Sequence, residues 1–120
     1  MEQYKLGEME QRFADIIWAY EPVTSRRLTE LCTQEFGWKR TTTYTMLKRL
    51  CDRKIFQNQQ GTVVSLMTKE EFQGAQGEQF LKENFEGSLP QFLAAFTRRN
   101  KLSKKEVLEI QRLIEEHKEG

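Results

Sequence analysis

The feature that most constrains the fold is a pair of amphipathic segments with a tight connection between them, followed by two β-prone runs. In the first segment, which begins after Val23, apolar residues recur at helical spacing: Leu28, Leu31, Cys32 and Phe36. Gly37 suits the end of that helix, because glycine readily adopts the left-handed conformation found there. A second helix is predicted from about Arg40 to Arg53. Two helices joined so closely are typical of a helix-turn-helix.

The residues that follow predict a small β-hairpin. The β-prone runs Ile55–Gln57 and Thr62–Met67 flank the polar, glycine-containing sequence Asn58–Gly61. Another helix, predicted from about Gly7 to Tyr20, precedes the pair and carries its own apolar stripe. Helix, helix-turn-helix and hairpin in that order predict a winged helix over residues 1–67, within a mainly α chain.

The predicted helix over Arg40–Arg53 has two chemically different sides. Leu47 and Leu50 are spaced to face a core, whereas hydroxyl and basic groups project from the opposite side. Such a side suits the major groove, because cations neutralise phosphates while hydroxyls and guanidinium groups reach base edges. The alternative is an ordinary solvated helix face. The candidate DNA-binding residues are Lys39, Arg40, Thr41, Tyr44, Thr45, Lys48 and Arg49.

The second half of the chain predicts helices that carry many aromatic residues. Capping boxes at Thr68 and at Ser103 begin two of them, and a short helix starts near Leu89. These helices are too few to form an independent domain, so residues 68–120 are predicted to form a homodimer. The alternative is that they fold back on the winged helix. The candidate dimerisation residues are Phe72, Phe80, Phe85, Phe92, Phe96, Val107, Ile110, Leu113 and Ile114.

Several functional classes find no support in the sequence. Cys32 and Cys51 fit small core residues better than a redox pair. Metal-ligand clusters, phosphate-binding loops and nucleophile–base pairs are missing at recognisable spacing, which predicts a protein that is not an enzyme and uses no cofactor or metal. The first residues lack the apolar core of a signal peptide, and no run approaches the ~20 apolar residues of a membrane span. The sequence therefore predicts a cytoplasmic protein without membrane insertion.

Over nearly its whole length the chain resembles the penicillinase-repressor family, the bacterial BlaI/MecI/CopY-type regulators. The resemblance lies in Ile16-Ile17-Trp18, in Trp38 and above all in Thr41–Leu50, which is close to the family's recognition-helix pattern. It implies a homodimeric winged-helix repressor that binds an inverted repeat in the operators of resistance genes. By position, it also implies that Thr41, Tyr44, Thr45 and Arg49 meet the DNA.

Three departures from the family pattern bear on function. The hairpin tip over Asn58–Thr62 has no charge, which favours an alternative: a winged-helix module that binds proteins and has given up DNA. In antibiotic-responsive members a membrane sensor protease triggers cleavage at an Asn–Phe bond, and the matching bond here is Ala95–Phe96. The paired CxC motifs of copper-responsive members are missing. Induction by proteolysis, by a small ligand or by neither stays open, as does repression of genes other than resistance genes.

Overall fold

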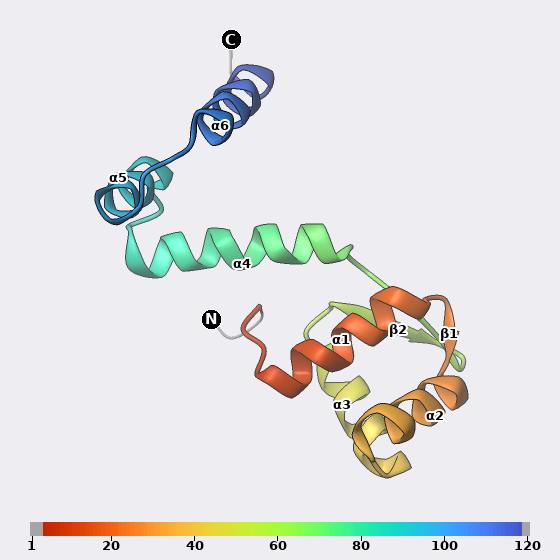
Figure 1. Cartoon of the computed structure of the whole chain (residues 1–120). Helices are drawn as coiled ribbons and strands as arrows, with labels where there is room; N and C mark the ends of the chain where they lie inside the picture. Colours follow the sequence, from red (N-terminus) through yellow and green to blue (C-terminus); the bar gives the residue numbers. More distant parts are fainter. Residues whose placement is uncertain (1–3, 119–120) are drawn as a thin grey trace. The chain divides into compact units, whose positions relative to one another are not determined.

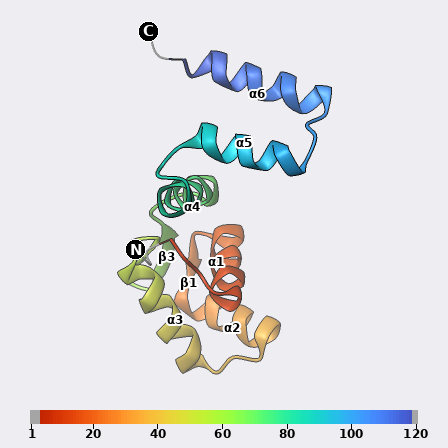
Figure 2. The ribbon, with the colours of Figure 1, turned by 90° about the vertical axis from the view of Figure 1, so that its left-hand side faces the viewer.

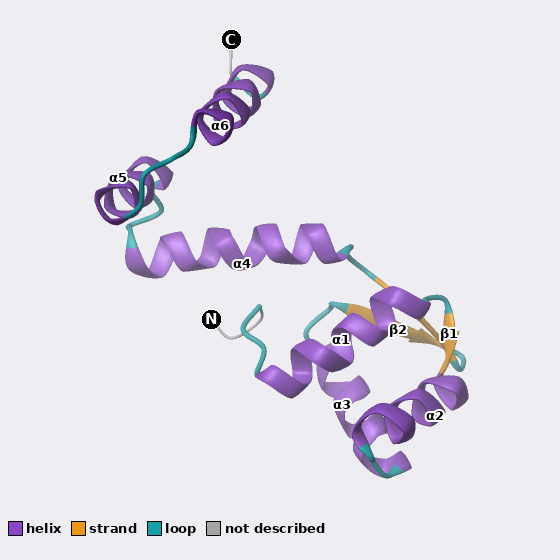
Figure 3. Ribbon diagram, viewed as in Figure 1, coloured by secondary structure: helices purple, strands orange, loops and turns teal. Residues whose placement is uncertain are grey.

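The computed structural model describes residues 4–118, which divide into two compact units that meet between Gln79 and Phe80. Its mainly helical composition with one small sheet confirms the predicted fold class (Figures 1 and 3). In chain order the elements are α1 (Glu8–Tyr20), β1 (Val23–Thr24), α2 (Ser25–Phe36), α3 (Arg40–Asp52), β2 (Phe56–Gln59), β3 (Thr62–Ser65), α4 (Lys69–Asn84), α5 (Leu89–Arg99) and α6 (Lys104–Glu116).

Local chemistry sets the ends of the helices in the first unit. The Thr24 hydroxyl accepts a hydrogen bond from the backbone N–H of Arg27 at 3.0 Å, so Thr24 is the N-cap of α2. Gly37 ends α2 with a φ of 68°, the left-handed conformation that glycine adopts without steric cost. The α3 helix then begins at Arg40, which leaves only a short turn between the two helices.

The sheet has the strand order β1-β3-β2, and both pairings are antiparallel. Gln59 pairs with Thr62, so Gln60 and Gly61 form a two-residue turn. Both have positive φ, at 54° and 94°, as in the type I′ turns that suit the twist of hairpins. The sequence pattern missed β1, because two residues are too few to show alternation; Val23 pairs with Val63.

The core of the first unit lies where α1, α2 and α3 meet the sheet (Figure 2). Its largest fully buried side chains include Phe13, Ile17, Leu28, Leu50, Ile55, Phe56 and Val63. The Trp18 indole packs against the ring of Phe56, with ring centroids 5.1 Å apart. Its Nε1–H donates to the backbone carbonyl of Met67 at 3.0 Å, which ties α1 to the residues just before α4.

One predicted dimerisation residue belongs to this core, which corrects the sequence prediction. Phe72 is 0% exposed and lies 5.4 Å, centroid to centroid, from the Trp18 ring. The Thr68–Glu71 capping box starts α4 directly after Met67, whose carbonyl accepts the hydrogen bond from Trp18. Phe72, in the first turn of α4, is therefore placed against the winged helix. A side chain buried within its own unit has no surface left for a partner. The first turns of α4 therefore pack as part of the winged-helix unit.

The second unit is built differently. All residues of α5 and α6 are described, and none of them is buried. The rings of Phe80, Phe85, Phe92 and Phe96 form a cluster whose neighbouring centroids lie 5.5–6.1 Å apart. Along α6, Leu108, Leu113 and Ile114 are each more than half exposed. Within residues 4–118, no helix combines the length and the apolar character needed to cross a bilayer.

Candidate nucleic-acid interface

The α3 helix is fixed in the first unit by one side and exposes the other. Thr43, Leu47 and Leu50 are buried, at the three- and four-residue spacing of a single helix face. The predicted DNA-binding residues of α3 all lie outside this buried stripe: Arg40, Thr41, Thr45, Lys48 and Arg49 are exposed, and Tyr44 is half-buried. Lys39, also exposed, is the N-cap of α3. The structure thus brings these residues together on one helix.

Tyr44 is held from two directions. Its Oη donates to the Ser25 Oγ, in the first turn of α2, at 3.4 Å. The Arg40 guanidinium lies over its ring, 5.6 Å from the centroid. Hydrogen bonds that Ser25, and then Arg40, can donate to the ionised phenol oxygen lower the pKa of Tyr44 from its usual value. Ser25 was not predicted as a site residue, because the contact depends on how α2 crosses α3.

The cations in the second half of α3 are ion-paired with carboxylates. Lys48 Nζ lies 3.1 Å from Asp52 Oδ2 on the same helix, and both side chains are mostly exposed. Arg49 Nη1 lies 3.6 Å from Glu10 Oε2, on α1. The Lys48–Asp52 pair is exposed on both sides and contributes at most about 1 kcal/mol, so Lys48 can turn to a phosphate at little cost. Glu10 was also missed, because only the tertiary fold brings it near α3.

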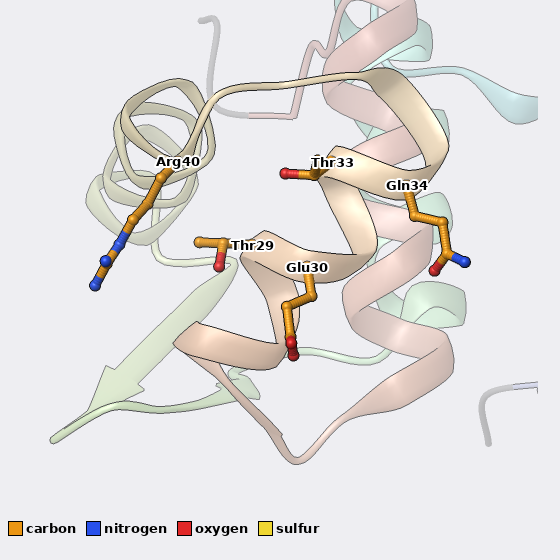
Figure 4. A pocket seen from close by; sticks show the side chains of 5 residues that line it. All are labelled: Thr29, Glu30, Thr33, Gln34 and Arg40. Atoms are coloured by element: carbon orange, nitrogen blue, oxygen red, sulfur yellow. The ribbon is translucent and has the colours of Figure 1, made fainter.

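An open pocket of about 360 Å³ lies between α2 and the start of α3 (Figure 4). Its lining residues are Thr29, Glu30, Thr33, Gln34 and Arg40. Thr33 Oγ1 donates to the carbonyl of Trp38 at 2.8 Å, which braces the turn between the two helices. With Glu30 and Arg40 on its wall the pocket carries both charges, so it offers no preference for an anion.

The hairpin adds hydrogen-bonding groups but no charge. Gln57, Asn58 and Gln59 are exposed, and the sequence from residue 55 to residue 67 contains no charged side chain. Asn58 Oδ1 accepts from the backbone N–H of Gly61 at 2.9 Å, which uses that side chain to brace the turn. Any attraction between this wing and a phosphate backbone is therefore weaker than that of α3.

A helix-turn-helix with a basic, hydroxyl-rich second helix and a hairpin wing defines a winged-helix regulator of the DNA-binding class. Residues 6–116 match the family model described as penicillinase repressor, from the start of α1 to the end of α6. The chain belongs to this family, which confirms the resemblance, and it is a transcriptional repressor of the winged-helix type. A comparison with curated proteins gave no match.

Proposed function

We propose that this repressor acts as a homodimer that binds an inverted-repeat operator, with α3 of each copy in the major groove. The observation that carries the proposal is the exposed side of α3. From Arg40 to Cys51 the helix has no acidic residue, and its exposed residues are hydroxyl-bearing or cationic. Negative phosphates therefore meet only favourable charge along most of its length.

The two ends of α3 take different roles in this proposal. Recognition helices contact base edges mainly through their N-terminal residues, which here are Arg40, Thr41, Tyr44 and Thr45. The Tyr44 ring edge suits thymine methyl groups, and one good base contact gives about 1–3 kcal/mol of discrimination. Lys39, Lys48 and Arg49 serve the phosphates. These contacts weaken or strengthen binding evenly across sequences.

The exposed apolar surface of the second unit supports dimerisation. Phe80, Leu113 and Ile114 are each at least half exposed, although they lie on helices that also carry many charges. An interface between two identical chains needs no other protein, because both copies present the same apolar surface. The predicted dimerisation residues Phe80, Phe85, Phe92, Phe96, Val107, Ile110, Leu113 and Ile114 all lie in this unit. Two linked recognition helices would bind two half-sites and block polymerase at the promoter.

Family membership supports genes of β-lactam resistance or a related stress response as targets, with a membrane sensor protease upstream. The bond that matches the family's cleavage position, Ala95–Phe96, lies inside α5. A protease binds its substrate as an extended chain, so cleavage there requires the second half of α5 to unwind. Because Ala95 replaces the family's Asn, we propose proteolysis here only as one of the open routes of induction.

Selection from random duplexes, followed by gel retardation, tests the proposed function. The wild-type chain should enrich an inverted repeat and bind it as two copies, as measured by light scattering on the complex. The double variant Arg40→Ala/Tyr44→Ala should lose the retarded band while light scattering still finds a dimer. Equal competition by random and selected duplexes would contradict sequence-specific binding.

The neutral wing favours one other candidate, a winged-helix module that binds proteins. A salt titration separates the two functions. A DNA-binding protein loses duplex affinity steeply as salt rises, because each neutralised phosphate releases counterions. A protein-binding module has no duplex affinity to lose at any salt concentration.

A further inference from the structure

Glu10 makes an unusual set of contacts at the end of α3. Its Oε1 accepts from the backbone N–H of Gly7, the N-cap residue of α1, at 2.9 Å. Its Oε2 is buried, has no hydrogen-bond partner, and lies 3.6 Å from Arg49 Nη1 and 3.7 Å from Arg53 Nη2. The carboxylate is thus held in place by the helix cap and faces two guanidinium groups.

The two arginines differ in how firmly the fold holds them. The Arg53 side chain is 24% exposed and also donates to the backbone carbonyl of Lys5 at 3.0 Å, so it is anchored on the N-terminal segment. The Arg49 side chain is 52% exposed, and 3.6 Å is too long for a hydrogen bond to Glu10. Arg49 is therefore drawn toward α1 by charge alone, and its donors stay accessible to another anion.

We propose that Glu10 is a positioning residue that draws Arg49 toward α1 and so weakens the binding of α3 to DNA phosphates. This inference rests on the proposed DNA binding. Arg49 lies in the last turn of α3, away from the N-terminal end that recognition helices direct at base edges, so its partner is a phosphate. Restraining it lowers affinity for every duplex by the same factor. Glu10 thereby limits non-specific binding without changing which sequence is preferred.

The variant Glu10→Gln tests this role. A glutamine amide oxygen can accept the same hydrogen bond from the Gly7 backbone N–H, so that bond is kept while the charge is removed. Glu8→Gln is the matched control: it removes one negative charge from the same first turn of α1, and no ion pair of Glu8 is found among residues 4–118. Affinities for a selected operator duplex and for a random duplex are measured with the full chain by fluorescence anisotropy at several salt concentrations.

We expect Glu10→Gln to steepen the slope of log affinity against log salt by about 0.9, the effect of one more neutralised phosphate. Between about 50 and 200 mM salt this corresponds to roughly a 3.5-fold larger loss of affinity than wild type. The gain at low salt should be equal for both duplexes, and Glu8→Gln should show a smaller change. In an Arg49→Gln background the effect of Glu10→Gln should vanish.

Three other outcomes would each overturn a stated part of this proposal. Equal slopes for wild type and Glu10→Gln, or equal effects of Glu10→Gln and Glu8→Gln, would overturn the role of Glu10 alone. A changed ratio between selected and random duplexes would place Arg49 on base edges and overturn the phosphate assignment. A wild-type chain that binds no duplex overturns the proposed function and this inference with it.

Discussion

The two units of the chain contain the same kinds of apolar residue, but the first unit buries them and the second leaves many of them exposed. In the first unit aromatic and aliphatic side chains close a core, and Phe13, Phe56 and Phe72 are all 0% exposed. In the second unit Phe80, on the same α4 helix as Phe72, is 50% exposed, and neither α5 nor α6 buries a residue. A count of aromatic residues cannot distinguish the two cases. What distinguishes them is whether another element of the same chain covers the ring.

The largest effect should come from truncating α4 where it meets the first core. Phe72→Ala removes a fully buried ring and is expected to lower the free energy of unfolding by about 3–5 kcal/mol, measured by urea denaturation. Phe80→Ala, on the same helix but half exposed, is the matched control and should cost much less in a dilute sample. Equal losses for the two variants would break the contrast between the units.

Charges placed on α6 test whether a second copy of the chain covers the exposed apolar surface of the second unit. Leu113→Glu/Ile114→Glu should weaken self-association at least a hundredfold, about 2.8 kcal/mol, because carboxylates would be desolvated without partners. Light scattering over a concentration series measures this. Gln111→Glu, an exposed change on the same helix, is the control for added charge. Unchanged association of the double variant would mean that α6 is not the interface.

Changes around Tyr44 should separate DNA binding from self-association. Tyr44→Ala is expected to cost about 1–3 kcal/mol of affinity for a selected duplex. Ser25→Ala removes only the hydrogen bond that positions the ring, and it should cost about 0.5–1.5 kcal/mol. Neither variant should alter dimerisation measured by light scattering. A loss of dimer in either would show that the two functions are not assigned to different units.

The smallest expected effect concerns the glycines of α4. At Gly77 an added Cβ meets nothing within 4 Å, so Gly77→Ala should stabilise the helix by up to ~1 kcal/mol in thermal unfolding. Gly74 is equally open and provides a second measurement. If either variant instead weakens self-association, a partner's backbone approaches α4 at that glycine, and the interface extends into the first unit.

The features that were predictable from sequence are those that a few neighbouring residues determine. The Gly37 helix end and the Thr68 and Ser103 capping boxes are each determined by residues within one helical turn of the helix end. The outward side of α3 was also predictable, because its buried stripe repeats at helical spacing.

The features that escaped prediction depend on contacts between distant segments. Phe72 reaches the core because Trp18 fixes the residues before α4, and its local pattern is that of any amphipathic helix. Ser25 and Glu10 gain their roles only when α2 and α1 pack beside α3. Their residue types, a hydroxyl and a carboxylate near helix starts, are fully accounted for by capping.

The neutral hairpin tip has an evolutionary consequence. Gln57 and Gln59 are exposed, and the turn is set by Asn58, Gln60 and Gly61, so either glutamine can be exchanged for lysine without disturbing the backbone. In the proposed complex with DNA, each exchange would add one cation to the wing. Affinity for DNA could then rise through the wing alone, without any change in α3 or in the core.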